Sequence, residues 1–250
     1  MKVITSERIP IKMWAESIED GAMEQAKNLA NMPYSHRHIA IMPDSHQGFG
    51  MPIGAVLATQ NAIVINAIGV DINCGMNAVN AEMNFCSNYA DISRNLMMHT
   101  FVDDLQEVIP EVTILDSVSI SHNFVRSEKH FGQSLWIHRK GAVPADGDTR
   151  GIIAGSQGTA SYIVQGLGNR ESFMTCSHGA GRVLGRKEAV RKLSLNEEQE
   201  KMKGIYNNMN SQEKLDEAPS CYKDIDEVMR QQEDLAQILV KLTPLGVVKG

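Results

Sequence analysis

The sequence predicts an α+β protein built as one domain. Three observations support this prediction. Short apolar runs of strand length are interspersed with longer segments that carry apolar residues at helical spacing. Polar residues appear repeatedly where the apolar runs end, as in a site that loops build on a rigid scaffold. No internal repeat, low-complexity segment or convincing linker divides the 250 residues.

The first third of the chain predicts one helix followed by strands. The amphipathic helix runs from Ser17 to Ala30, and Ser17 with Asp20 three residues later would suit its N-terminal cap. Short apolar runs predict strands at 38–42 and 53–58, and a third apolar run covers 62–70. A turn-rich loop is expected at 43–50, between the first two strands.

The remainder alternates helices with strands and loops. The spacing predicts a helix over 89–108, strand or strand-edge segments at 119–128 and 134–138, and loops through the Gly- and Ala-rich stretch 141–161. It further predicts a helix with a basic face over 180–193, a helix over 225–242, and a strand over 245–249.

Composition limits the possible protein classes. Hydrophobic residues make up 42% and charged residues 22%, as is usual for a globular protein. The net charge of −6 gives no sign of bulk nucleic-acid affinity, although a local basic groove remains compatible with it. The four cysteines form no CxxC pair, and neither a secretory leader nor an apolar run of membrane-spanning length is visible. The cytoplasm is therefore the expected location.

The segment Ser177-His178-Gly179-Ala180-Gly181-Arg182 is the most informative stretch for chemistry. Glycines allow backbone N–H groups to approach an anion, and arginine can hold a phosphate with two hydrogen bonds. A histidine in such a nest can attack phosphorus. The alternative is a glycine-rich turn with a solvated arginine, since short motifs give many false positives.

Candidate metal ligands occur in two places. Asp71 and Cys74 lie three residues apart in a glycine-flanked turn, and a carboxylate with a thiolate suits a metal such as Zn²⁺ or Mn²⁺. His122 follows a strand-like run and could complete the set. The alternatives are a capped turn with a buried cysteine and a core histidine. His46, beside Asp44, has the same two interpretations.

Two further segments could bind phosphate. His138-Arg139-Lys140-Gly141 places two cations beside a flexible residue, and a solvated basic turn is the alternative. The stretch 155–162, Gly-Ser-Gln-Gly-Thr-Ala-Ser-Tyr, offers N–H and O–H donors to nucleotide phosphates. It matches neither a P-loop nor a GxGxxG fingerprint, so taken alone it is a weak signal.

Eight such motifs in this order resemble the RtcB family of RNA-splicing ligases, and together they cover nearly the whole chain. They are Met42-Pro43-Asp44-Ser45-His46-Gln47-Gly48, Gly69-Val70-Asp71-Ile72-Asn73-Cys74-Gly75-Met76, Ser121-His122-Asn123-Phe124, His138-Arg139-Lys140-Gly141-Ala142, Gly155-Ser156-Gln157-Gly158, Ser177 to Arg182, Tyr222-Lys223-Asp224-Ile225-Asp226 and Lys249-Gly250. One departure is Gln157, where the family usually has Met. The resemblance implies mixed sheets with flanking helices around a central metal and nucleotide cleft.

The resemblance also implies a reaction. The family joins RNA ends bearing a 2′,3′-cyclic phosphate or 3′-phosphate to 5′-OH ends, in tRNA splicing and RNA repair. It uses GTP and Mn²⁺ and passes through a histidine–GMP intermediate, for which His178 is the nucleophile by position. Asp71, Cys74 and His122 are implied metal ligands. The implied nucleotide contacts are His122, Asn123, Ala154, Gly155, Ser156, Gln157, Ser161, His178, Gly179, Ala180, Gly181, Tyr222 and Lys249.

The resemblance breaks between about residues 79 and 82, where the family's long middle segment is missing from this chain. That segment normally carries two motifs, each with a metal-binding histidine, so three ligands are expected here where the family uses five. His36, His38 or His46 could in principle substitute. An internally deleted relative that binds GMP or metal without ligating is therefore the alternative function. The expected partners are RNA and GTP, with an archease-like activator possible; no membrane partner is expected, and the oligomeric state is left open.

Overall fold

A six-stranded mixed sheet forms the first half of the computed structural model, which describes residues 1–68 and 80–247. Most of its neighbouring strands are antiparallel, and β2 and β3 are parallel. Buried branched and small apolar residues dominate its central strands, as expected where both faces of a sheet are covered. The strand order is β1 (Lys2–Ile4), β2 (Ile11–Met13), β3 (Ser35–His46), β4 (Ile53–Thr59), β6 (Gln133–Lys140) and β5 (Asn123–His130).

The two faces of this sheet bury separate apolar cores. Helix α1 (Asp20–Asn31) covers one face, where Leu29 packs among side chains that include Ile39 and Ile41 of β3. The alternate β3 residues Ala40 and Met42 face the second core, as the two-residue period of a strand requires. This second face therefore receives the later parts of the chain.

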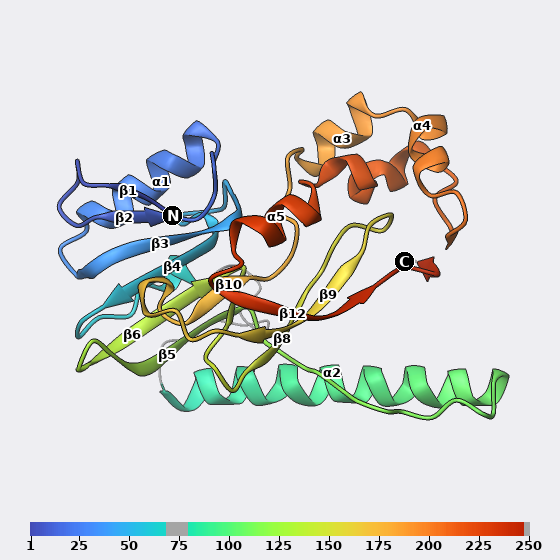
Figure 1. Cartoon of the computed structure of the whole chain (residues 1–250), viewed down its shortest axis with the longest axis horizontal. Helices are drawn as coiled ribbons and strands as arrows, with labels where there is room; N and C mark the ends of the chain where they lie inside the picture. Colours follow the sequence, from blue (N-terminus) through green and yellow to red (C-terminus); the bar gives the residue numbers. More distant parts are fainter. Residues whose placement is uncertain (69–79, 248–250) are drawn as a thin grey trace.

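Two smaller sheets lie against the second face. One pairs β7 (Ala142–Pro144) with β10 (Thr175–Ser177), and the other has the order β12 (Ala236–Leu242), β9 (Ser161–Gly166), β8 (Arg150–Ile153). Helix α5 (Ile225–Gln231) also packs here, and the short turn η2 (Arg170–Ser172) precedes β10. These elements carry the Gly-rich segments of the sequence toward the end of β3 (Figure 1).

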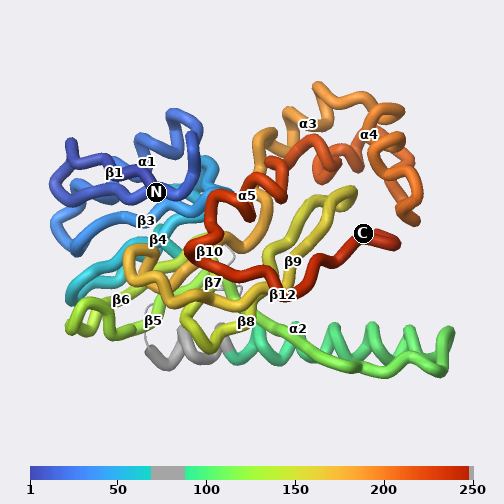
Figure 2. Tube along the Cα trace, in the orientation of Figure 1, coloured from blue at the N-terminus to red at the C-terminus, as the bar shows by residue number. Residues whose placement is uncertain are grey.

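Helix α2 (Asn80–Val108) lies along one side of the molecule and extends beyond its body, and the chain after it returns beside the helix to β5 (Figures 1 and 2). Its Tyr89, Ile92 and Leu96 side chains are 59–66% exposed. None of the helices in the described ranges is both long and apolar enough to span a bilayer.

A helical lobe follows β10. It contains α3 (Arg186–Lys192), α4 (Leu195–Lys201) and the turns η3 (Gln212–Glu217) and η4 (Pro219–Cys221), packed around a small core of their own. The parallel pair β11 (Tyr206–Asn207) and β13 (Gly246–Val247) joins this lobe to the last described residues. Figure 2 shows the lobe at the opposite end of the molecule from β1 and β2.

Several sequence-based expectations agree with these elements and others are wrong. The predicted α+β class is confirmed, as are the strand at 53–58 and the helix over 89–108. The expected cap at Ser17 is wrong, because α1 begins after Glu19 and no side chain caps it. The loop expected at 43–50 is wrong up to His46, because β3 continues to that residue and its last part is buried. The apolar run 62–70 holds only the short turn η1 (Ile65–Ala67) among its described residues.

The largest errors lie in the C-terminal half. Strands β7 and β8 occupy part of the expected loop 141–161. The helix expected over 180–193 is reduced to α3, since residues 180–185 form an irregular segment that bonds to the residues around Cys221. The helix expected over 225–242 ends at Gln231, and β12 follows because Ile238 and Val240 pair with the edge of β9, with Leu239 at a bulge between them. In residues 236–242 the apolar pattern of a helix could not be told from that of a strand that is apolar on both faces.

Candidate active site

His178 lies directly after β10, at a point where three parts of the chain meet. Its carbonyl accepts a hydrogen bond of 3.1 Å from the N–H of Ala154, and the N–H of Ala180 donates to the Ala154 carbonyl at 2.9 Å. This short bridge fixes the backbone on both sides of the histidine. The pairing of β10 with β7 holds the preceding residues, so His178 projects from a rigid support.

Asp44 of β3 holds the His178 ring. Its Oδ2 lies 2.8 Å from His178 Nδ1 and 3.3 Å from the His178 N–H. Burial alone lowers the pKa of His178, but the hydrogen bond and the charge of Asp44 outweigh it, so the pKa is raised above its usual value. Burial in turn raises the pKa of the fully buried Asp44, and the histidine outweighs this effect and lowers it. The pair therefore favours a charged carboxylate that orients the imidazole.

Glycines allow this close approach of backbone and side chains. Gly181 has a φ of +77°, and a Cβ there would stand 2.0 Å from the Asp44 carbonyl oxygen. Gly141 has a φ of +59°, and a Cβ there would meet His178 Cε1 at 3.1 Å and a side-chain carbon of Ile53 at 2.3 Å. Residues with side chains would push Asp44 and His178 apart at both positions.

His122 stacks on His178 in the wall of a cleft. The two ring centroids are 4.9 Å apart, with 27° between the ring planes. The cleft has a volume of about 420 Å³ and runs between α2 and the β8 region, with both histidines in its wall. Burial, followed by the neighbouring His178, lowers the pKa of His122 to about 4. His122 is therefore neutral at pH 7, as a metal ligand must be, and it is exposed at the cleft.

Arg94 brings a cation from α2 to the same cleft. Its guanidinium pairs with Asp91 and lies 3.2 Å from the Ser121 hydroxyl, next to His122. No sequence motif marked Arg94, because its position depends on how α2 packs and not on its neighbours in the chain.

The predicted metal set is only partly described. Asp71 and Cys74 lie outside the described residues, and so does Lys249. Within residues 1–68 and 80–247, no group of three His, Cys, Asp or Glu side chains is arranged to hold a metal ion. The donor chemistry nevertheless fits one, since a neutral exposed imidazole, a carboxylate and a thiolate are together suitable for a borderline metal.

Of the histidines that could substitute as ligands, His38 is excluded. It is buried, its Nε2 lies 2.7 Å from the Glu171 carbonyl oxygen, and its ring stacks on Phe173. His46 remains near the site, with its Nδ1 3.0 Å from the Asp44 carbonyl oxygen, and burial lowers its pKa. No contact brings His36 to the site in the described part of the chain.

The predicted nucleotide cradle is compact and lies next to His178. The N–H of Gly155 donates to the Ser161 hydroxyl at 3.1 Å, and the N–H of Ser156 donates to the Thr159 hydroxyl at 2.7 Å. A Cβ at Gly155 would stand 2.0 Å from the Ala160 carbonyl oxygen. The bridge between Ala154 and Gly179 joins the cradle to the His178 segment, and Gln157 lies in the turn of the cradle.

Asn123 and Tyr222 have structural contacts beside their implied roles. Asn123 Oδ1 accepts a hydrogen bond of 2.7 Å from the N–H of Gly141, which supports the loop under His178. The Tyr222 hydroxyl bonds to Glu217 and lies 3.1 Å from Arg182, whose guanidinium is 5.1 Å from the centre of the tyrosine ring. Arg182 is therefore ion-paired with Glu217, and does not stand as a free phosphate clamp.

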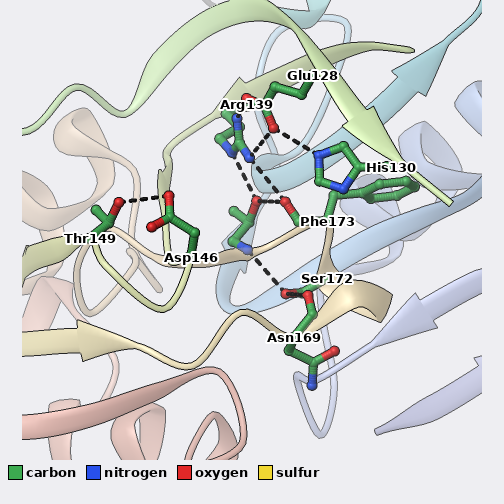
Figure 3. A network of polar contacts seen from close by, with 9 residues as sticks. Glu128, His130, Arg139, Asp146, Thr149, Asn169, Ser172 and Phe173 are labelled. Atoms are coloured by element: carbon green, nitrogen blue, oxygen red, sulfur yellow. Dashed lines mark hydrogen bonds and ion pairs between the residues drawn. The ribbon is translucent and has the colours of Figure 1, made fainter. Parts of the chain in front are cut away.

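The suggestion that Arg139 and Lys140 bind phosphate is wrong. Arg139 is 1% exposed and forms two hydrogen bonds with Glu128, and it also donates to Thr175 and to the Phe173 carbonyl (Figure 3). Lys140 is buried and donates to backbone carbonyls that include that of Phe49. Arg139 therefore ties β6 to β10, which supports His178, and Lys140 holds the chain around Phe49.

Asp44 and Lys223 both support His178, although the sequence motifs that contain them gave neither residue a role. Lys223 Nζ donates to the carbonyl oxygens of Pro43 at 2.9 Å and Ser45 at 2.7 Å, on either side of Asp44. It thereby fixes the end of β3 that carries the carboxylate. Both residues lie in motifs already noted, but only the fold brings 44, 178 and 223 together.

Comparison with known proteins gives one family. The family model described as tRNA-splicing ligase RtcB matches residues 25–85 and 80–250. RNA-splicing ligase RtcB1 of an Escherichia coli strain is 28% identical over 406 aligned positions, covering 100% of this chain and 99% of that protein. RNA-splicing ligase RtcB of Escherichia coli K12 is 27% identical with the same coverage. The tRNA-splicing ligase RtcB of Pyrobaculum aerophilum is 34% identical over 193 residues, 66% of this chain and 40% of that protein.

The lengths of these alignments differ from that of the chain. The alignment with the Escherichia coli proteins extends over 406 positions, whereas the chain has 250 residues, so those relatives contain much sequence without a counterpart here. The two stretches matched by the family model meet at residues 80–85. The sequence analysis placed the missing segment between about residues 79 and 82, next to this junction, and its absence from the chain stays a prediction.

Proposed function

The chain belongs to the tRNA-splicing ligase RtcB family, and on that premise we propose that it is a GTP- and Mn²⁺-dependent RNA ligase. It joins RNA ends bearing a 2′,3′-cyclic phosphate or a 3′-phosphate to 5′-OH ends through a histidine–GMP intermediate on His178. The observation that carries this proposal is the 2.8 Å contact between Asp44 and His178 Nδ1, beside a glycine-framed cradle. We expect the protein in the cytoplasm, and an archease-like activator as a possible partner.

The nucleophile is Nε2 of His178. Because Asp44 holds the proton of Nδ1, Nε2 keeps its lone pair in the neutral ring. A bond forms between Nε2 and the α-phosphorus of GTP while the bond to pyrophosphate breaks. Asp44 stabilises the positive charge that develops on the ring, which is the role of a carboxylate behind a reacting histidine. GMP then passes to the RNA 3′-phosphate, and the 5′-OH displaces it.

Asp71, Cys74 and His122 would hold Mn²⁺. When bound, the metal neutralises phosphate charge and orients the leaving pyrophosphate. His122 fits this role because its pKa of about 4 leaves it neutral at pH 7. Its stacking on His178 brings a ligand for the metal beside the reacting nitrogen.

The remaining implied contacts bind the nucleotide. The segments 154–157 and 179–181 and the Ser161 hydroxyl would line the site for the GMP phosphate and sugar. The N–H groups of Ala154, Gly155, Ser156 and Ala180 already donate within the protein, so they would shape this site and not bind the phosphate themselves. Asn123 would contact phosphate, Tyr222 would pack on guanine, and Lys249 would bind the base edge. The cleft of about 420 Å³ beside the two histidines is the space for the RNA ends.

The second candidate is a relative that binds GMP or metal without ligating. The observation that favours it is the alignment with the Escherichia coli relatives, which extends over 406 positions against the 250 residues of this chain. Calorimetry would then show nucleotide or metal binding with no covalent transfer, and sealing of a 2′,3′-cyclic-phosphate RNA to a 5′-OH RNA would exclude this candidate.

Guanylylation tests the proposal. Incubation with α-labelled GTP and Mn²⁺ should leave an acid-labile label on the wild-type protein, and His178→Ala should abolish it. His36→Ala, a histidine of β3 with no contact to the site in the described part of the chain, is the matched control and should label normally. Absence of label from the wild-type protein with every divalent metal tried would contradict the proposed reaction.

A further inference from the structure

A second positively charged feature lies at the other end of the strands that support His178. We propose that Arg37 and Arg170, held against the ring of Phe131, form a docking site for the RNA phosphate backbone away from the sealing site. This inference rests on the proposed RNA ligase function. Its evidence is independent of the His178 site, because none of these three residues contacts it.

The two arginines share one aromatic ring. The guanidinium carbon of Arg37 lies 3.8 Å from the centre of the Phe131 ring, and that of Arg170 lies 5.2 Å from it. Phe173 supports the ring from its edge, at 5.9 Å between centroids. Cations held over an aromatic face lose little further freedom on binding a phosphate, so the pair is prepared for an anion.

Both guanidinium groups remain available to a ligand. Arg37 and Arg170 are exposed, and neither forms an ion pair with any residue that the structure describes. The neighbouring Lys12 differs, because Glu171 pairs with it. The cluster is therefore locally positive on a chain with a net charge of −6, and a polyanion is the partner that this charge selects.

The backbone at Arg37 is strained to produce this arrangement. Arg37 has a φ of +65°, in the left-handed region that non-glycine residues rarely adopt, whereas the φ of +52° at Phe131 belongs to the two-residue hairpin turn between β5 and β6. The pairing of β3 with β4 is irregular between Ser35 and Ile39, so the bulge turns Arg37 outward. Such strain costs about 1–2 kcal/mol per residue, and retained strain points to a function.

The position of the cluster fits an RNA bound at His178. Arg37 and Asp44 lie seven residues apart on β3, which is about 23 Å along the strand. Two further segments connect the same two places. Strand β6 runs from the turn at Phe131 to Gly141, and the chain from η2 to the end of β10 runs from Arg170 to His178. At about 3.4 Å per nucleotide of a stacked strand, the separation corresponds to about seven nucleotides.

RNA binding by charge-matched double variants tests the site. Fluorescence anisotropy with an RNA of about 25 nucleotides is measured against salt concentration for wild type, for R37Q/R170Q and for K27Q/K203Q. Lys27 is an exposed residue of α1, the helix that covers the opposite face of the sheet, and Lys203 lies in the helical lobe. The control variant therefore removes the same number of positive charges at positions away from the proposed site. R37Q/R170Q should weaken binding about tenfold and reduce the salt slope by about 2, since each phosphate contact contributes about 1. The control should keep the wild-type slope.

The same samples separate this inference from the proposed function. Labelling with α-labelled GTP should be equal in wild type and in both double variants, because neither arginine contacts the His178 site. A DNA strand of the same sequence should lose affinity equally in R37Q/R170Q, since the site binds phosphates. Equal salt slopes for the two double variants, with labelling intact, would overturn the docking site alone. A wild-type protein that neither labels nor binds RNA would overturn both proposals.

Discussion

The two ends of β3 hold charged residues in opposite environments. At one end Asp44 is fully buried, bonded to His178, and enclosed by glycines and by the Lys223 contacts. At the other end Arg37 is exposed, unpaired among the described residues, and supported only by the ring of Phe131. The difference shows how one strand can serve two purposes. A buried, paired charge orients a neighbouring group, whereas an exposed, unpaired charge is free to recruit a ligand.

The Arg139 network lies between these ends and shows what pairing does to an arginine. Arg139 also lies near an aromatic ring, since its guanidinium carbon is 5.3 Å from the Phe124 ring centre, compared with 3.8 Å between Arg37 and the Phe131 ring centre. Its two hydrogen bonds to Glu128 nevertheless make it structural (Figure 3). The residue type alone therefore does not show whether an arginine is structural or free to bind a ligand. The presence or absence of a carboxylate partner decides between the two roles.

The largest effect is expected from Asp44→Asn. An amide can donate its N–H to His178 Nδ1, which would place the ring proton on Nε2 and block attack. We expect the labelling rate to fall by about 10²- to 10⁴-fold, as when other catalytic histidines lose their carboxylate. Single-turnover labelling with α-labelled GTP measures it.

The pH profile distinguishes this effect from misfolding. Attack requires neutral His178, and Asp44 raises the pKa of His178, so the wild-type rate should increase as pH rises through that raised pKa. In Asp44→Asn the residual rate should rise at a lower pH. Asp20→Asn, on an exposed carboxylate of α1, should leave both rate and profile unchanged. An unshifted profile in a folded Asp44→Asn protein would contradict the orienting role.

The next effect is expected between the two ends, from Glu128→Gln. Removing this carboxylate leaves the Arg139 charge buried without its partner, which should lower the free energy of unfolding by about 3–5 kcal/mol. Urea unfolding at pH 7 measures the loss. Glu200→Gln is the matched control, because Glu200 is 72% exposed and pairs with Lys203 at the surface, and it should cost less than about 1 kcal/mol.

The pKa of Glu128 also determines how the stability lost in Glu128→Gln depends on pH. Burial raises the pKa of Glu128, but its bonds to His130 and Arg139 outweigh this and lower the pKa to about 2. The carboxylate therefore stabilises the fold above its ordinary pKa of 4.5, and this contribution is lost as pH falls toward 2. The difference between wild type and Glu128→Gln should shrink over that range. A difference that stays constant with pH would contradict the ion-pair explanation.

How much of this site the sequence predicted depends on the kind of contact. The His178 segment and the cradle at 154–161 were found because their glycines and donors are local in the chain, and the structure places them side by side. The pairing of Asp44 with His178 spans 134 residues, so no spacing rule could connect the two, although both motifs were noted. Arg94 and the Arg37 cluster left no signal, because each depends on packing between distant elements.

Errors in the fold have a similar origin. The segment 236–242 was predicted as helix because its apolar residues also suit helical spacing, and only the free edge of β9 makes it β12. The predicted phosphate role of Arg139 failed because Glu128, on the neighbouring strand of the hairpin, neutralises it. Local patterns thus identified the chemistry and the four long strands β3 to β6, while long-range partners decided which cations are free.

The smallest effect is expected from comparing Arg37→Gly with Arg37→Gln at the exposed end of β3. Glycine adopts a φ of +65° without the cost of about 1–2 kcal/mol that other residues bear, whereas glutamine keeps that cost. Both lose the contact with Phe131, worth about 0.5–1 kcal/mol at an exposed site. The free energy of unfolding of Arg37→Gly, measured with urea, should therefore be higher than that of Arg37→Gln by about 1 kcal/mol.

RNA binding should not follow that order of stability. Both variants lack the cation, so both should bind the 25-nucleotide RNA equally weakly, with a salt slope smaller than that of wild type by about 1. This result would show that the bulge at Arg37 sacrifices stability to hold a charge outward. If RNA affinity instead rose and fell with stability in the two variants, the strain would belong to the fold of β3 and not to the recruitment of RNA, and the two ends of the strand would no longer differ in purpose.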